Sequence, residues 1–195
     1  MAEAVVVTPS KFSSFKGALT HGGARPSLFE VTISVPTTDV TGSVTNMATH
    51  CNVSAIPGLT VTPIERQYFG RTVKIPGDMV FGDLSTTIIN SQDYSLRKVL
   101  EKWMDVMNST GGNLGYSDST SGFGSVTLKQ YSKDGSVLLK WIFVDCWPQT
   151  ISEIALSYDT ASDIEQFDVT WAYNYYTQTK GNATTTDLST YSEQE

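Results

Sequence analysis

Hydrophobic and polar residues alternate along several stretches of this chain, and this alternation limits its fold more than any other feature. Phe29, Val31, Ile33 and Val35 alternate with polar neighbours, and the same period of two runs through residues 164–176. A period of two is typical of a β-strand with one face in a core and the other in solvent. The alternation therefore predicts a mainly β fold.

Other runs of β-forming residues between turn signals complete the predicted strands. The predicted strands cover residues 29–35, 47–56, 84–90, 126–130, 137–144, 154–158 and 164–176. Asp134-Gly135 is a hairpin turn signal. The strand at 137–144 is apolar on both faces and is therefore expected to be central and to end at Trp147-Pro148. The strand at 164–176 would span roughly 40 Å, so it is expected to be the longest and to invite a partner chain.

One segment has a helical period instead. Its apolar residues fall at i, i+3, i+4, i+7 and i+11 and form a single stripe: Leu96, Val99, Leu100, Trp103 and Met107. Ser91 or Asp93 is the expected N-cap, and Gly111-Gly112 ends the region. One α-helix with seven or eight antiparallel strands predicts a β-sandwich or a partly closed barrel.

Residues 57–82 are the least ordinary part of the chain. The stretch is bracketed by Pro57-Gly58 and Pro76-Gly77. Its central part, Ile64–Ile75, is rich in β-formers but alternates only weakly, and Gly70 is expected to mark a bulge or a bend. Irregular stretches of this length inside compact domains are usually functional. We expect a long, protruding hairpin here.

Charge is unevenly distributed along the 195 residues, whose net charge of −7 makes the chain a poor candidate for wrapping nucleic acid. Between Glu65 and Asp78 there are three basic residues and no acidic one, whereas between Lys140 and Lys180 there are six acidic residues and no basic one. One interpretation is a solvated acidic face and an ordinary basic loop. The other is that the basic protrusion of one copy meets the acidic edge of the next, which would produce rings or filaments.

Recognisable catalytic and metal-binding patterns are absent from the sequence. No zinc signature is present, and the glycine-rich run Gly111–Gly115 lacks the Lys-Ser/Thr of a phosphate loop. His50 and Cys51 are expected to lie in one strand on opposite faces, where they cannot share a metal ion. Acid pairs such as Asp159 with Asp163 flank a turn, where carboxylates are usually solvated. We therefore expect no enzyme activity, no cofactor and no metal.

A pattern of short segments spread over residues 24–176 points to a known family. The segments are Ala24–Val31, Ala55–Gly58, Tyr68–Asp78, Phe81, the helix ending near Trp103, Leu139–Pro148 and Ile164–Thr170. In this order they resemble the tail tube proteins of contractile-tailed, T-even-like bacteriophages, to which the tube proteins of type VI secretion systems are similar in fold.

The resemblance implies a structural subunit that forms hexameric rings, stacked into a hollow tube inside a contractile sheath. The implied partners are further copies of the chain, the tail sheath protein, the baseplate and tail terminator proteins and the tape measure protein. DNA would pass through the tube during genome ejection without specific binding. The implied location is the virion tail, assembled in the host cytoplasm. The tail tube domain would occupy residues 25–176, between a flexible N-terminal arm at 1–24 and a polar C-terminal tail at 177–195.

Candidate inter-subunit contact residues come from the basic protrusion and from the acidic stretch. They are Arg66, Tyr68, Arg71, Lys74, Asp78, Asp159, Asp163 and Glu165. The competing interpretation is a carbohydrate-binding β-sandwich module, in which Tyr173, Tyr175 and Tyr176 would form an exposed stacking platform. That module would be a monomer, whereas the tube subunit would form rings or tubes.

Overall fold

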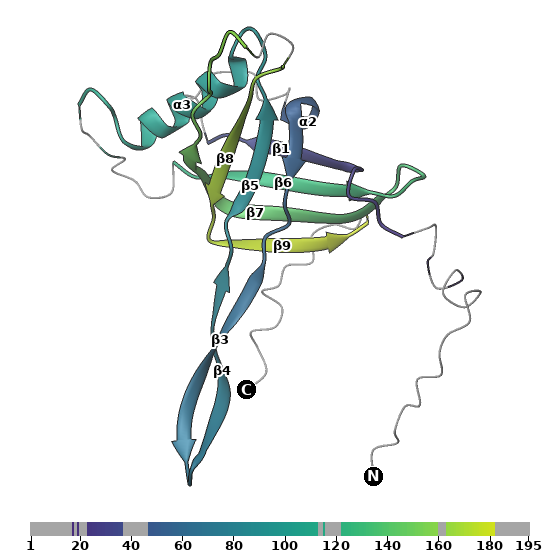
Figure 1. The fold of residues 1–195 in the computed structure, drawn as a ribbon, viewed down its shortest axis with the longest axis vertical. Helices are drawn as coiled ribbons and strands as arrows, with labels where there is room; N and C mark the ends of the chain where they lie inside the picture. Colours follow the sequence, from purple (N-terminus) through teal and green to yellow (C-terminus); the bar gives the residue numbers. More distant parts are fainter. Residues whose placement is uncertain are drawn as a thin grey trace.

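The protein has an antiparallel β body with a helix at its side and one long projecting hairpin (Figure 1). The computed structural model describes residues 17, 19, 23–36, 47–112, 115, 122–159 and 163–181. The strands are β1 (Phe29–Ser34), β2 (Cys51–Ser54), β3 (Leu59–Tyr68), β4 (Arg71–Phe81), β5 (Leu84–Ile89), β6 (Gly124–Tyr131), β7 (Val137–Ile151), β8 (Gln166–Ala172) and β9 (Tyr175–Lys180). The helices are α2 (Met47–His50) and α3 (Ser95–Met107).

Seven of the strands form one sheet, in the order β1-β6-β7-β8-β5-β2, with β9 also paired to β7. Of the strands that the structure describes, the remaining two, β3 and β4, pair with each other and with no other strand, and they form the hairpin. All pairings are antiparallel. Since β1 and β2 at the two ends do not pair with each other, the sheet is not closed into a barrel. The prediction of a mainly β, antiparallel and incompletely closed fold is confirmed.

Strand β7 bends at Asp145 and thereby belongs to both halves of the sheet. Its residues up to Val144 pair with β9, and its residues from Trp147 onward pair with β8. Asp145 has a φ of 53°, in the left-handed region that Asp adopts more readily than most residues. The side-chain amide of Asn174 donates a 3.0 Å hydrogen bond to the Asp145 carboxylate. The chain turns the same corner between β8 and β9.

Two sequence predictions are wrong at this corner. The expected strand at 164–176 is divided into β8 and β9, so β7 is longer than either part. Trp147-Pro148 does not end β7, which continues to Ile151. The pairing register shifts between Pro148 and Thr150, and such irregularities are places where a sheet tolerates proline, which has no N–H to donate.

Two other predicted strands also differ from the structure. Residues 47–50 form the short helix α2, which agrees with the helix propensity of Met and Ala, and only Cys51–Ser54 is extended. The fully buried Met47 ties α2 to the core. Because His50 ends α2 and Cys51 begins β2, they do not share a strand as expected. Residues 154–158 form no strand, since nothing in the described chain pairs with them.

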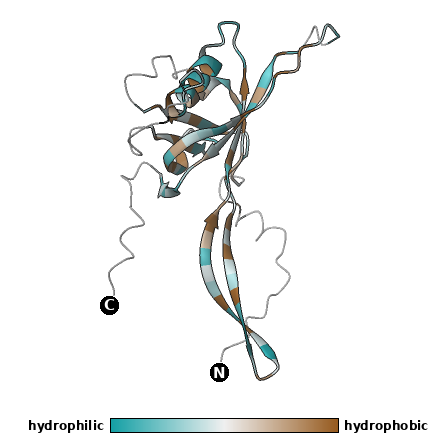
Figure 2. Cartoon of the chain, turned by 90° about the vertical axis from the view of Figure 1, so that its left-hand side faces the viewer, coloured by the Kyte–Doolittle hydropathy of each residue, from teal (hydrophilic) through white to brown (hydrophobic). Residues whose placement is uncertain are grey.

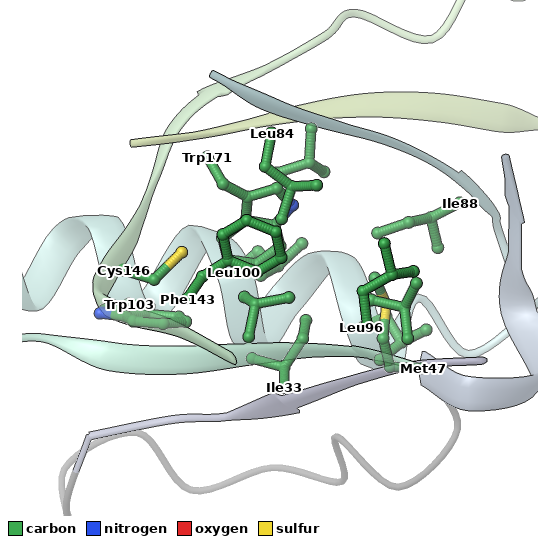
Figure 3. Close-up of a cluster of buried hydrophobic side chains, with 14 of the residues drawn as sticks. Ile33, Met47, Leu84, Ile88, Leu96, Leu100, Trp103, Phe143, Cys146 and Trp171 are labelled. Atoms are coloured by element: carbon green, nitrogen blue, oxygen red, sulfur yellow. The ribbon is translucent and has the colours of Figure 1, made fainter. Parts of the chain in front are cut away.

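Helix α3 packs its apolar stripe against the sheet, as predicted (Figure 3). Leu96, Leu100 and Trp103 are at most 4% exposed. The ring centroids of Trp103 and Trp171 are 5.9 Å apart, and Trp103 Nε1 donates a 2.9 Å hydrogen bond to the carbonyl oxygen of Gly122. Trp103 therefore joins the helix, the sheet and the segment that leads into β6.

The N-cap of α3 lies one residue after Asp93 and three residues after Ser91, the two predicted caps. The N-cap is Tyr94, with a φ of 54° and no side-chain capping bond. The Asp93 carboxylate still accepts a 3.3 Å hydrogen bond from the backbone N–H of Ser95, one of the groups that a helix leaves unpaired at its start. The prediction that Ser91 or Asp93 is the N-cap is therefore wrong, although Asp93 still binds the first turn of the helix.

The hairpin β3–β4 contains a bulge at Gly77. The register shifts between Val61 and Pro63, where β4 has one extra residue. A Cβ atom on Gly77 would lie 2.6 Å from the backbone oxygen of Thr62 and 2.8 Å from a side-chain carbon of Ile64. A side chain at this position would therefore have to displace the backbone of β3.

Gly77→Ala is expected to loosen the hairpin without unfolding the body. Overpacking of this kind typically costs about 1–3 kcal/mol. Limited trypsin digestion measures the effect, because Arg66, Arg71 and Lys74 lie within the hairpin, where cleavage should become faster. The matched control is Gly58→Ala, since a Cβ there meets no atom within 4 Å. Equal cleavage rates in the two variants would contradict the prediction.

Candidate assembly interface

The predicted protruding hairpin is confirmed, and it leaves both of its faces in solvent. Every residue of β3 is exposed, as is all of β4 except Gly77 and Phe81. Hydrophobic residues recur along both strands (Figure 2). Large apolar side chains that are 44–54% exposed are Leu59, Val61, Ile64, Val73, Ile75, Met79 and Val80. An isolated two-stranded hairpin is marginally stable in water, and extensive exposed apolar surface marks an interaction site.

Phe69 and Gly70 form the two-residue tip of the hairpin. Their φ angles are 45° and 75°, and positive values at both positions define a type I′ turn, which favours Asn, Asp and Gly. Gly70 therefore belongs to the turn itself. Phe69 is 90% exposed, and its ring stands edge-on to Tyr68 with 4.6 Å between the centroids.

The distal half of the hairpin has two chemically different faces, because side chains alternate along each strand. One face, here called the docking face, carries the cross-strand pairs Ile64–Ile75, Arg66–Val73 and Tyr68–Arg71. The other face carries Gln67 opposite Thr72 and Glu65 opposite Lys74. Glu65 Oε1 and Lys74 Nζ form an ion pair at 3.2 Å. The docking face thus combines apolar side chains with the basic Arg66 and Arg71. The opposite face carries the Glu65–Lys74 ion pair, in which the two charges neutralise each other.

The structure separates the residues that the sequence grouped in the basic protrusion. Arg66, Tyr68 and Arg71 share the docking face. Lys74 points the opposite way and already has an acidic partner within the hairpin. Asp78 is exposed beside the bulge in β4.

The acidic candidates lie where the connection from β7 enters β8. Asp159 and Asp163 are exposed there. Glu165 is half-buried, and its Oε2 accepts 2.9 Å hydrogen bonds from the Tyr94 hydroxyl and the Asn90 amide. The hydrogen bond to Glu165 raises the pKa of Tyr94. Glu165 therefore contributes to contacts within the subunit, whereas Asp159 and Asp163 present their carboxylates to solvent.

The remaining acids of the 141–179 stretch do not form one continuous edge with these residues. Asp145 lies at the bend of β7. Asp168 lies within β8 and accepts a 2.6 Å hydrogen bond from the Thr87 hydroxyl on β5. The expected acidic edge is therefore concentrated in the β7–β8 connection, which also contains the exposed Glu153.

A pocket of about 420 Å³ opens in this connection and is here called the β7–β8 pocket. Its described lining residues are Ala155, Leu156, Ser157, Tyr158, Asp163 and Glu165. Leu156 is 80% exposed, and Tyr158 is completely exposed. Ile164, 68% exposed, follows directly after Asp163. The pocket therefore combines apolar side chains with carboxylates.

The tip of the β3–β4 hairpin and the described part of the β7–β8 connection lie at opposite ends of the long axis of the molecule (Figure 1). Strand β5 follows the hairpin, and its far end, Ile89, pairs with Gln166 beside the pocket. A contact between these two ends of identical subunits is heterologous, so it propagates into a ring or a filament.

The described residues contain no group of three or more His, Cys, Asp or Glu side chains placed to hold a metal ion. Burial raises the pKa of the Cys51 and Cys146 thiols to about 12, so both stay protonated and weakly nucleophilic at neutral pH. No helix in the described part of the chain is long and apolar enough to cross a membrane.

The tyrosines of the carbohydrate-binding alternative do not form a common exposed platform. The Tyr173 hydroxyl donates a 2.6 Å hydrogen bond to the Gly82 carbonyl oxygen, and its ring lies 4.9 Å from that of Phe143. The Tyr176 ring lies 5.8 Å from the same phenylalanine. Of the three tyrosines, Tyr175 alone is exposed, at 45%. The structure gives this alternative no support.

The apolar part of both surfaces was missed by sequence reasoning. Phe69, Leu156 and Tyr158 were not among the candidate contact residues. A signal existed for Phe69, since a two-residue turn ending in glycine between β-forming runs places its first residue at a hairpin tip. The alternation of Leu156 and Tyr158 instead suggested a strand.

Comparison with known proteins gives one consistent result. The family described as phage tail tube protein matches residues 24–179. The chain is 27% identical over 154 residues to tail tube protein gp19 of Enterobacteria phage T4, covering 78% of this chain and 90% of that protein. It is 27% identical over 161 residues to the tail tube protein of Serratia phage KSP90, covering 80% and 89%. Its fold is similar to a chain in the PVC sheath-tube complex of an extracellular contractile injection system in the extended state. That likeness has a TM-score of 0.58 at 14% identity and covers 88% of this chain and 99% of the other.

Proposed function

The chain belongs to the phage tail tube protein family, and from this premise we propose that it polymerises into the tube wall as stacked hexameric rings. It is a structural subunit of a phage tail tube and a component of the virion tail. The resemblance found in the sequence is thereby confirmed. The fold likeness to a chain of a contractile sheath-tube complex supports the ring-and-stack arrangement.

The observation that carries this proposal is the uncovered hairpin. Both faces of β3 and β4 are exposed along their length, including seven large apolar side chains. A monomer gains nothing from this surface, because apolar area left in water contributes no burial energy. A polymer covers it with a neighbouring subunit, so assembly stabilises the hairpin further.

We place the inter-subunit contact between the docking face of one copy and the β7–β8 connection of the next. Arg66 and Arg71 then meet Asp159 and Asp163, and complementary charge of this kind speeds association and fixes the register of the contact. Among the other candidates, Tyr68 joins the docking face, and Asp78 and Glu165 remain predicted contacts near it. Lys74 is left out of the proposed contact, because it lies on the opposite face in an ion pair with Glu65.

A tube subunit is also expected to contact other proteins of the tail. The tube would contact the tail sheath protein on its outside, the baseplate and the tail terminator at its ends, and the tape measure protein and then DNA in its lumen. Assembly would take place in the host cytoplasm. We propose that the chain acts in all of these contacts as a structural part and not as a catalyst.

Negative-stain electron microscopy of the purified protein tests the proposal. We expect rings at low concentration and stacked tubes at high concentration or on a baseplate template. Sedimentation should show a concentration-dependent rise in mass. A protein that stays a small, featureless particle and sediments as a monomer at high concentration and low salt would contradict the proposed assembly.

Assembled tubes are expected to bind DNA weakly or not at all. The chain carries a net charge of −7, and residues 141–179 contribute six acids without a base. Each phosphate contact would add affinity and slow the passage of the genome, whereas like charge keeps the duplex hydrated and mobile. Fluorescence anisotropy of short duplex DNA titrated with tubes at low salt measures this. Tight binding that weakens steeply with added salt would contradict the prediction.

A further inference from the structure

Resting on the proposed function, we propose that the aromatic tip of the hairpin, Tyr68 and Phe69, inserts into the β7–β8 pocket of a second copy of this chain. The contact is thus anchored by an aromatic side chain in a pocket, with the charge pairs arranged around it.

The tip is built from a residue that the turn itself does not favour. Phe69 occupies the first central position of a type I′ turn with a φ of 45°, where Asn, Asp or Gly is less strained. Its ring is 90% exposed, and that of Tyr68 is 67% exposed. Phe69 thus has an unfavourable backbone conformation, and its ring is not buried within the subunit. Strained residues cluster at functional positions, so we infer that a partner buries this ring.

The pocket has the size and chemistry to receive such a tip. Its volume of about 420 Å³ lies in the range of roughly 300–1,000 Å³ found for small-molecule sites. Leu156 and Tyr158 supply apolar and aromatic walls, and both are largely exposed in the isolated subunit. Aromatic anchors that fill such pockets dominate the energy of many protein interfaces.

The surroundings of the tip and of the pocket are complementary in charge. Arg66 and Arg71 flank the tip on the docking face. Asp163 lines the pocket, and the exposed Asp159 directly follows the lining residue Tyr158 in the chain. The hairpin tip and the described part of the β7–β8 connection lie at opposite ends of one subunit (Figure 1), so the tip does not reach the pocket of its own subunit. A second copy is therefore the occupant.

A double-mutant cycle on the critical concentration for polymerisation tests the proposal. Phe69→Asn keeps the turn, because Asn favours a positive φ, and removes the ring. Tyr158→Ala removes the pocket wall. Each is expected to raise the critical concentration about tenfold or more, and the pair should cost no more than the larger single effect. Tyr175→Ala, on β9, is the control that should combine with Phe69→Asn additively. A wild-type critical concentration for Phe69→Asn, or full additivity with Tyr158→Ala, would overturn the proposal.

Disulfide trapping provides a second measurement that keeps the aromatic tip and the two large walls of the pocket, Leu156 and Tyr158, unchanged. Gln67→Cys lies beside the tip, and Ser157→Cys lies in the pocket lining. The native thiols compete little, since burial holds their pKa at about 12. Oxidised tubes of the double variant should give a ladder of covalent oligomers on a non-reducing gel, which Gln67→Cys with Val53→Cys should not give. Tubes without a ladder overturn the inference alone, whereas a wild type that forms no rings or tubes overturns the proposed function.

Discussion

Subunits carrying Arg66→Glu and Arg71→Glu are expected to remain monomeric at concentrations where the wild type forms tubes. Both arginines lie on the docking face and are exposed, and they are proposed to meet Asp159 and Asp163 of the next copy. Like charges brought together in an interface cost several kcal/mol, which corresponds to a critical concentration at least about 100-fold higher. Analytical ultracentrifugation and negative-stain microscopy measure this effect.

The matched control reverses charge on the opposite face of the same hairpin. Exchanging the pair as Glu65→Lys with Lys74→Glu preserves the ion pair that joins the two strands. This variant should polymerise almost as the wild type does. Far-ultraviolet circular dichroism should be unchanged in both variants, because exposed charges contribute little to subunit stability. Normal tubes from the Arg66/Arg71 double reversal would refute the assignment of this face to the contact.

Local signals in the sequence were sufficient for much of the fold. The alternation at 29–35 and the helical stripe from Leu96 to Met107 correspond to β1 and α3, and the hairpin at 57–82 projects as expected. In each case the apolar pattern within a single segment is enough to predict its structure. The corner at Asp145 was not predictable in this way, because it depends on β8 and β9 pairing with different halves of β7. Long-range pairing leaves no periodic trace in the segments that it bends.

In the candidate site, the charged residues could be predicted from the sequence, whereas their arrangement on the two faces of the hairpin could not. The run of bases around Arg66 and Arg71 and the acids at Asp159 and Asp163 were found from composition alone. Which bases share a face depends on the tip, since a two-residue turn sets Tyr68 opposite Arg71 and thereby fixes every other pair in the distal hairpin. The pocket forms where residues 154–158 have no partner strand among the described residues. Alternation in the sequence does not show whether a partner strand is present.

Trp103→Ala is expected to be among the most destabilising single substitutions in the body of the subunit. The ring is fully buried and contacts Trp171, and its Nε1 bonds the Gly122 carbonyl oxygen. A Cβ on Gly124 would lie 2.7 Å from the Trp103 ring, so β6 packs closely on the indole. Truncating a buried Trp to Ala removes the transfer energy and leaves a cavity, which costs about 3–5 kcal/mol, and it also leaves a buried carbonyl without its donor.

Urea unfolding measured by Trp fluorescence and circular dichroism gives the free energy, provided that assembly does not contribute to it. The Arg66→Glu/Arg71→Glu background serves this purpose, because a subunit that binds its neighbours is stabilised by mass action. In that background Trp103→Ala should lower the urea midpoint, and the free energy of unfolding should fall by about 3–5 kcal/mol. The control Lys98→Ala, an exposed position on the same helix, should change the free energy by no more than about 0.5 kcal/mol. Equal midpoints for Trp103→Ala and its parent would mean that the stripe of α3 contributes nothing to the core, against the burial of Leu96, Leu100 and Trp103 together.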